Sequence, residues 1–307
     1  MYCDIAYKCN HYFVTLPQRK DKYLDMKRIF SILLCVLCLA CIPMTVYGQA
    51  QIKTKKVMIG DFGTKTMKVV LGSNIMLDEA LEREIAGHWR ISPYEFCTVD
   101  EFEKLKHSQD YYFLLPLKKL SGKDAGLVML NLFKGGPEKN PEGNVKMTDV
   151  ASFPISSVNY PSGREFVFLA AALDIMQDYV GKAMNSDFEG YSGFSIYNSP
   201  KASAGRRIVF SEEDLSPAID DYVKAKYFDD GISTDEDADE LMVDGGDVLV
   251  SFVVAPSEPK RGNRCYKMLI DARTHEMVYF KSHRISESKW VGFQAKDLKA
   301  IARGRKK

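Results

Sequence analysis

The 307-residue sequence predicts an α/β fold of two tandem, duplicated modules, each with an open mixed sheet. The first observation is that one order of elements, strand, helix, strand, helix, strand, strand, occurs twice along the chain. The second is that the spellings Thr98-Val-Asp-Glu101 and Ser233-Thr-Asp-Glu236 both form a capping box, which opens the second helix of each copy. The third is a stretch rich in Gly, Ser and Pro at residues 186–205, which predicts a linker between the copies.

The first module covers residues 51–185. Apolar runs predict its strands, and apolar residues at every fourth position predict its helices. Leu77, Leu81 and Ile85 share one face of a predicted helix in this way. The expected elements are a strand at 67–71, a helix at 75–88, a short strand at 89–92, a helix at 98–105, strands at 111–117, 126–133 and 153–158, and a long closing helix. A loop at 135–143 interrupts this module.

The second module covers residues 206–307. Ser216-Pro217 opens its first helix, because proline suits the first helical position. In the match between the copies, Ile232-Ser233 corresponds to Ile91-Ser92. The expected elements are a strand at 207–210, a helix, a strand at 228–233, a helix ending at 241, a strand at 248–255, a hairpin of 266–271 and 276–281, a strand at 284–286 and a terminal helix.

The helix that closes the first module is strongly apolar. Ser162 and Glu165 spell a third capping box at its start. Two adjacent apolar stripes follow, so that more than half of its circumference is hydrophobic. Such a helix is expected to lie between two layers of the fold. The stripe residues are Phe166, Leu169, Leu173, Met176 and Val180, with Phe168, Ala172, Ile175 and Tyr179 beside them.

Residues 26–50 have the layout of a bacterial export signal. A Met is followed by Lys27 and Arg28, then by an uncharged apolar run at 29–42, a proline and small residues. Cleavage after Gly48 or Ala50 is expected, which gives a periplasmic or secreted protein. The alternatives are an uncleaved membrane anchor and lipidation at Cys41.

Residues 1–25 have no place in such a signal, and we interpret them as disordered residues that follow a start codon assigned too early. Residues 1–50 hold six basic and three acidic residues, which leaves 36 basic and 38 acidic residues in the exported chain. With charges so evenly balanced, the exported chain has no positive electrostatic field that would attract nucleic acid. It also has no polybasic face that would bind anionic lipid.

Only two cysteines, Cys97 and Cys265, follow the signal segment. In an oxidising compartment they can form a disulfide. The alternative is that each is a buried free thiol in its own module.

Residues 69–92 and 208–233 follow the order strand, helix, strand with a polar turn at the end. In this order the chain resembles the small α/β modules of envelope proteins, such as the TolB N-terminal domain and the curli-secretion lipoprotein family. The resemblance implies a role in envelope assembly or binding without catalysis.

The turn that contains Asp61, Gly63 and Thr64 resembles the first phosphate loop of actin-like kinases. Those folds need a second glycine-rich phosphate loop, and the segment from Asp271 to Thr274 lacks the glycines. A plain β-turn is therefore the favoured interpretation, and no cofactor is expected.

Asp235, Asp237 and Asp239 alternate along the chain and suggest a calcium loop. An EF-hand requires glycine at its sixth position and glutamate at its twelfth, where this chain has Glu240 and Gly246. The favoured interpretation is that these acids occupy the first turns of a helix, where its dipole stabilises them.

The four histidines that follow the signal segment, His88, His107, His275 and His283, show no metal-binding spacing, and no catalytic motif accompanies them. No metal site and no catalytic residue are therefore predicted. Aromatic residues in a Gly/Ser-rich linker are harder to explain as core, so a recognition surface is placed there. It consists of Tyr191, Phe194 and Tyr197. The alternative is that the linker packs back over the edge of a module.

The expected function is that of an exported, non-catalytic envelope or secreted protein, which binds a protein or a cell-surface component. The alternative is a secreted hydrolase whose site lies between the two modules. An enzyme requires titratable groups that converge in a pocket, whereas a binding module requires an exposed apolar or aromatic patch.

Overall fold

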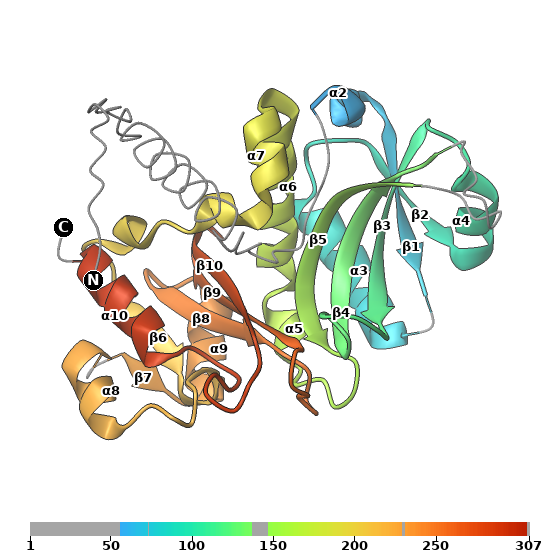
Figure 1. The fold of residues 1–307 in the computed structure, drawn as a ribbon. Helices are drawn as coiled ribbons and strands as arrows, with labels where there is room; N and C mark the ends of the chain where they lie inside the picture. The colour runs from blue at the N-terminus through green and yellow to red at the C-terminus, as the bar shows by residue number, and fades with distance from the viewer. Residues whose placement is uncertain (1–55, 73, 137–146, 229–230, 306–307) are drawn as a thin grey trace, which may run out of the picture. The chain divides into compact units, whose positions relative to one another are not determined.

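The computed structural model describes residues 56–72, 74–136, 147–228 and 231–305. The expected signal segment, the cleavage positions Gly48 and Ala50, and Cys41 lie outside the described residues. The described residues all belong to one compact unit. Within it, two five-stranded sheets are joined by a central helix and a linker (Figure 1).

The first sheet has the strand order β2-β1-β3-β4-β5. Its first strand, β1, is parallel to β2 and to β3, while β3, β4 and β5 are antiparallel to one another. The strands are β1 Thr66–Leu71, β2 Tyr94–Thr98, β3 Tyr111–Lys119, β4 Leu127–Lys134 and β5 Thr148–Ser157. The helices of this part are α2 Lys56–Ile59, the short 3-10 turn η1 Phe62–Thr64, α3 Ile75–His88 and α4 Val99–Leu105.

The second sheet repeats this topology with the order β10-β9-β8-β6-β7. Its first strand, β6, is again parallel to its two neighbours, and the remaining pairs are antiparallel. The strands are β6 Ile208–Ser211, β7 Ile232–Ser233, β8 Leu249–Val254, β9 Arg264–Asp271 and β10 Met277–Arg284. The helices are η4 Glu212–Asp214, α8 Asp221–Phe228, α9 Asp235–Val243 and α10 Ala295–Arg305. The predicted α/β fold with two similar mixed sheets is thus confirmed.

The helices repeat as well as the strands. In the first part, α3 and the closing helix α6 (Leu169–Asn185) pack on one face of the sheet, and α4 covers the other. In the second part, α8 and the closing helix α10 share one face, and α9 packs on the other. Each sheet is therefore covered on both faces, which explains why so many strand residues are apolar without alternation.

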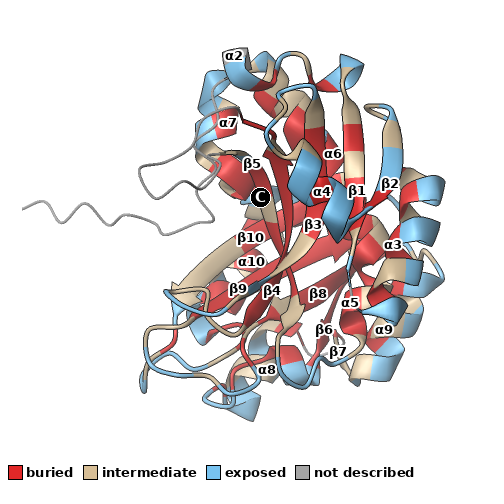
Figure 2. Ribbon diagram, turned by 90° about the vertical axis from the view of Figure 1, so that its right-hand side faces the viewer, coloured by how far each residue is buried: buried red, intermediate tan, exposed pale blue. Residues whose placement is uncertain are grey.

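Helix α6 lies between the two sheets, as the sequence predicted. It follows the short helix α5 (Arg164–Val167) and buries residues around most of its circumference. A single hydrophobic core contains residues of α6, of the first sheet and of the facing side of the second sheet. Figure 2 shows this core in red, with exposed residues concentrated on the outer helices and loops.

The linker is built of short helices, α7 Asp187–Ser192, η2 Gly193–Tyr197 and η3 Pro200–Ser203. Phe194 is 1% exposed and packs against Phe153, Tyr179 and Phe280. Tyr197 is also buried, and its hydroxyl donates to Asp178 at 2.6 Å. Of the three residues in the predicted recognition surface, only Tyr191 is exposed. Phe194 and Tyr197 therefore contribute to the core, whereas Tyr191 and the neighbouring Phe188 on α7 are exposed.

Several predicted boundaries were wrong, among them the strand predicted at 228–233, because Phe228 ends α8 and β7 consists only of Ile232–Ser233. Residues 89–92 form a turn in which the indole of Trp89 donates to Ser92 at 3.0 Å, and the strand begins at Tyr94. Ile232-Ser233 therefore corresponds to the end of β2, because Ser233 pairs with the last residue of β6 as Thr98 pairs with the last residue of β1. Arg284 ends β10, and this strand takes the place of β5 in the repeat. Helix α8 begins at Asp221, after a turn.

Of the three predicted capping boxes, the one at Thr98 and Glu101 is confirmed. In the second copy the helix begins one residue later than predicted, and its N-cap is Thr234, whose side chain accepts from the backbone of Asp237. Helix α5 has Gly163 as its N-cap, with a φ of 90° that favours glycine. Ser162 and Glu165 bind backbone amides only two residues away.

Candidate functional site: a cavity beside a buried arginine

A cavity of about 890 Å³ opens where β6 and β7 end. A second cavity of about 460 Å³ adjoins it at the end of β8 and shares Arg164, Asp235 and Trp290 with it. The chain leaves β6 toward β7 on one side and returns to β8 on the other, so these cavities lie at a switch point of the sheet. The carboxyl ends of parallel strands at such a point are the usual place for ligands in open α/β sheets.

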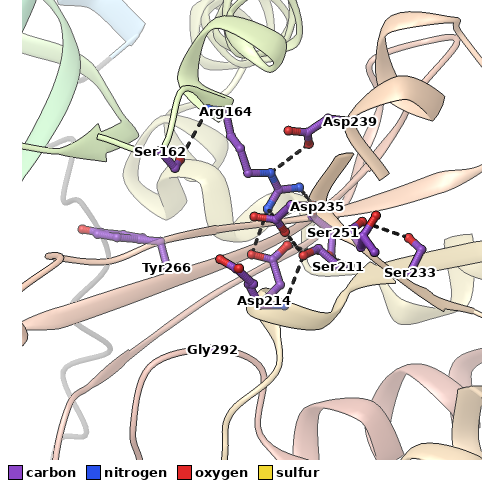
Figure 3. Close-up of polar contacts among 12 residues, drawn as sticks. Ser162, Arg164, Ser211, Asp214, Ser233, Asp235, Asp239, Ser251, Tyr266 and Gly292 are labelled. Carbon is purple, nitrogen blue, oxygen red and sulfur yellow. Dashed lines mark hydrogen bonds and ion pairs between the residues drawn. The ribbon is translucent and has the colours of Figure 1, made fainter. Parts of the chain in front are cut away.

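Arg164, at the start of α5, is the centre of this region (Figure 3). Its Nε donates to Asp239 at 2.8 Å, and its Nη1 lies 3.1 Å from Asp214 and 3.7 Å from Asp235. Its Nη2 donates to the backbone carbonyl of Ser251 at 3.1 Å. The guanidinium group therefore joins the start of α5 to three segments of the second part, namely η4, α9 and β8.

Two aromatic rings hold the arginine in place. Phe168 and Phe252 stack at a centroid distance of 4.2 Å, and the guanidinium carbon lies 5.3 Å and 5.8 Å from their centroids. The residue is 6% exposed. A planar cation against aromatic faces is stabilised by the quadrupole of the rings, more strongly where water is excluded.

Two serines bind the carboxylates that surround the arginine. The Ser251 hydroxyl donates to Asp214 at 2.5 Å, and the Ser211 hydroxyl donates to Asp235. Ser251 also accepts from the backbone amide of Ser211 at 2.9 Å, which links β8 to β6. The ends of the parallel strands thus fix the positions of the acids.

Burial shifts the ionisation of this cluster. Burial of Asp235, with repulsion from Asp214 and Glu213, raises its pKa to about 6, although Arg164 partly offsets the shift. Burial likewise raises the pKa of Asp239. The pKa of Arg164 is also raised, because the three carboxylates more than offset the opposing effect of burial. The cluster therefore holds more negative than positive charge at neutral pH.

Asp235→Asn is expected to stabilise the protein at pH 7, by roughly 1–3 kcal/mol. The folded carboxyl has a pKa of about 6 against 3.8 as the ordinary value, so the folded state binds more protons between these values. The stability of the wild type therefore falls as the pH rises through this window, and asparagine removes the loss. Urea unfolding at pH 3.5 and pH 7 measures the difference, with the exposed Asp237→Asn on the same helix as the control. Equal effects of the two variants at pH 7 would contradict the prediction.

Two of the three aspartates that suggested a calcium loop lie close together in the structure. Asp235 and Asp239 both approach Arg164, whereas Asp237 is exposed on the other side of α9. A guanidinium group occupies the position to which the two carboxylates point. The arrangement is therefore an ion-pair cluster.

The turn at Asp61, Gly63 and Thr64 is the 3-10 turn η1. Thr64 donates to the carbonyl of Asp61 at 2.9 Å, and the Asp61 carboxylate accepts from Tyr112 at 2.6 Å and from Lys134 at 2.7 Å. Burial opposes ionisation of Asp61, but these two donors lower its pKa overall. The lysine and the tyrosine thus hold the carboxylate in a structural role.

Cys97 and Cys265 are both buried free thiols. Cys97 belongs to the small core under α4, and the backbone amide of Gly292 donates to the sulfur of Cys265 at 3.3 Å. Burial raises the pKa of Cys97 to about 11 and that of Cys265 to about 12, so both thiols stay protonated at neutral pH.

The sequence did not predict Arg164 or Asp214 as site residues. The available signal was a charged residue in an apolar context, since Arg164 precedes the long apolar helix α6 and Asp214 lies three residues after the buried strand β6. Neither residue indicates the other as its partner, because Arg164 and Asp214 lie 50 positions apart in the sequence.

The chain matches no protein-family model, no curated protein and no solved structure. The resemblance to envelope α/β modules accordingly stays a prediction. Among the described residues, none of the helices has the length and apolar character that crossing a membrane requires.

Proposed function

We propose that this chain is an exported, non-catalytic binding protein, and that the cavity beside Arg164 receives a basic segment of a protein partner. The observation that carries the proposal is the excess of acids around the cavity. Its acidic lining residues are Glu212, Glu213, Asp235, Glu236 and Asp239, and the basic ones are Arg164 and Lys224. Arg164 is engaged with carboxylates and Nζ of Lys224 lies 3.4 Å from Glu212, so the acids still exceed the available cations and the rim glutamates attract a lysine or arginine side chain.

The position of Trp290 favours the binding of a cationic ligand. Trp290 lines both cavities and is 42% exposed, so it is accessible to a ligand there. An indole ring is the best aromatic partner for a cation. A lysine or arginine that enters between Trp290 and the rim glutamates meets both kinds of stabilisation.

The contacts of the cavity favour binding over catalysis. Ser251 donates its hydroxyl proton to Asp214 and Ser211 donates to Asp235, and both carboxylates also pair with Arg164. Both serines are buried and neither lines the two cavities, so their hydroxyls are not placed to attack a bound ligand. Of the described residues that line the cavities, none is a histidine or a cysteine that could act as the usual base or nucleophile. The export pattern at residues 26–50 and the near-neutral charge of the remaining chain support a role in the envelope or outside the cell.

The test is titration of the protein with a tetralysine peptide, followed by tryptophan fluorescence at low and high salt. The double substitution Glu212→Gln/Glu213→Gln is expected to weaken binding about 5-fold or more at low salt, because each exposed ion pair contributes up to about 1 kcal/mol. A matched control is Asp237→Asn, which removes one exposed acid outside the cavity lining. Equal affinity of wild type and double variant, or equal binding of a tetraglutamate peptide, would contradict the proposal.

One observation favours a second candidate function, a secreted hydrolase. Asp235 has a pKa of about 6 and lines the cavity together with Asp239, as a general acid and its partner carboxylate do. A panel of chromogenic esters, glycosides and peptides tests this candidate. Turnover that disappears in Asp235→Asn would establish it and replace the binding proposal, and no turnover by the wild type would eliminate it.

A further inference from the structure

We propose that His88, Asp174 and His275 form a binding site for a divalent transition-metal ion, with Zn²⁺ as the expected occupant. The three residues come from three separate elements, the end of α3, the middle of α6 and the turn between β9 and β10. None of them lines the cavity beside Arg164, so the site is independent of the proposed binding function.

The donor atoms already converge. Nδ1 of His88 lies 3.0 Å from Oδ2 of Asp174, and Nδ1 of His275 lies 2.6 Å from the same oxygen. One donor atom from each of the three residues lies within 4.8 Å of the others. Tetrahedral zinc with bonds of about 2.0–2.2 Å places its donors roughly 3.3 Å apart. Small movements of the two imidazole rings away from the carboxylate therefore make room for the ion.

Neighbouring groups orient these donors. Gln177 is buried and donates to the other carboxylate oxygen, Oδ1 of Asp174, at 3.1 Å, which directs Oδ2 to the histidines. The same amide group donates to the backbone carbonyl of His88 at 3.0 Å. Glu84 lies 3.6 Å from Nε2 of His88, where it favours a proton on Nε2 and leaves Nδ1 free to bind a metal. Partners of this kind usually accompany metal-binding histidines and carboxylates.

The backbone at His275 provides a second, independent observation. This residue has a φ of 57°, in the left-handed region that favours glycine and asparagine. Placing a histidine in this conformation raises the free energy of the folded state by about 1 kcal/mol or more. Residues strained in this way concentrate at functional sites. The turn is held by Asp271, whose side chain accepts from the backbone of Arg273 at 2.9 Å and of Thr274 at 2.6 Å. A rigid turn thus presents the imidazole of His275 to Asp174.

The ligand set indicates the metal. Two imidazoles and one carboxylate suit zinc and its neighbours in the first transition row, whereas calcium and magnesium require oxygen ligands. The side chains of His88 and Asp174 are each 31% exposed and that of His275 is 17% exposed, so water can complete the coordination. The ion would join the β9–β10 turn of the second sheet to the two helices on the first sheet.

The test is isothermal titration of the untagged, chelator-treated full chain with Zn²⁺, repeated with Co²⁺ for its visible spectrum. The wild type is expected to bind one ion per chain, and the cobalt spectrum is expected to show the band intensities of four or five ligands. His275→Asn, which keeps a residue suited to positive φ, is expected to weaken binding at least about 100-fold. Zinc is also expected to raise the Tm of the wild type and to leave that of His275→Asn unchanged.

The matched control is His107→Asn, because His107 is an exposed histidine at the end of α4. It is expected to bind zinc as the wild type does. His88→Asn provides a second variant in case one substitution disturbs folding, which circular dichroism monitors. Absence of stoichiometric binding by the folded wild type, or equal binding by the His88→Asn/His275→Asn double variant, would overturn the proposal and leave a hydrogen-bonded cluster only.

Discussion

Replacing Arg164 with methionine is expected to lower the free energy of unfolding at pH 7 by about 3–5 kcal/mol. Methionine fills the space beside the stacked rings of Phe168 and Phe252 but carries no charge. Asp214, which is 3% exposed, and the partly buried Asp235 and Asp239 then face one another without a cation. Breaking a buried ion pair from one side is costly because the remaining charges stay desolvated.

The pH dependence distinguishes this charge effect from a loss of packing. Urea unfolding at pH 7 and pH 5 is the measurement, with Arg207→Met as a control because Arg207 is exposed. As the pH falls from 7 to 5, Asp235 protonates, since its pKa is about 6, and the deficit of the Arg164 variant is expected to shrink. A deficit that is the same at both pH values, or no larger than that of Arg207→Met, would argue against uncompensated charge as its cause.

The sequence predicted the two-sheet architecture because the evidence for it is local. Apolar runs identify strands, and the repeated order of elements implies a repeated topology, which the strand orders confirm. Boundaries were less certain where two local signals compete. Ser233 and Thr234 both suit an N-cap, and only the register with β6 decides between them.

The sites could not be predicted in the same way, because they depend on contacts between distant segments. His88 and His275 are 187 positions apart, and both reach Asp174 only because α6 lies between the sheets. Composition was misleading in the linker. Its glycines and serines suggested exposure, yet Phe194 and Tyr197 fill a space next to Tyr179 and Phe280 that the short helices enclose.

Asp297→Asn is expected to destabilise the protein by about 3–5 kcal/mol at pH 7. Asp297 and Lys267 are each 1% exposed and form an ion pair between α10 and β9. Tyr279 donates to the other carboxylate oxygen at 3.0 Å, and the backbone amide of Gln294 donates at 3.0 Å, so the carboxylate is well satisfied. Burial opposes its ionisation, but Lys267 and these donors lower the pKa of Asp297. The pair therefore stabilises the wild type above pH 3.8, and the contribution is lost as the pH falls through the folded pKa.

Asparagine keeps the shape of Asp297 but leaves the ammonium group of Lys267 buried without a counter-charge. Burial already lowers the pKa of Lys267, and loss of the carboxylate lowers it further. The folded variant then binds fewer protons than its unfolded state below pH 10.5, so its stability should rise with pH in that range. Urea unfolding between pH 6 and pH 9 measures this slope, with the exposed Asp244→Asn as the control.

The double substitution Lys267→Met/Asp297→Leu should recover most of the loss, because apolar side chains replace a buried pair at little cost. If the double variant is as unstable as Asp297→Asn, the loss of stability comes from packing in the first turn of α10 and not from the unpaired lysine.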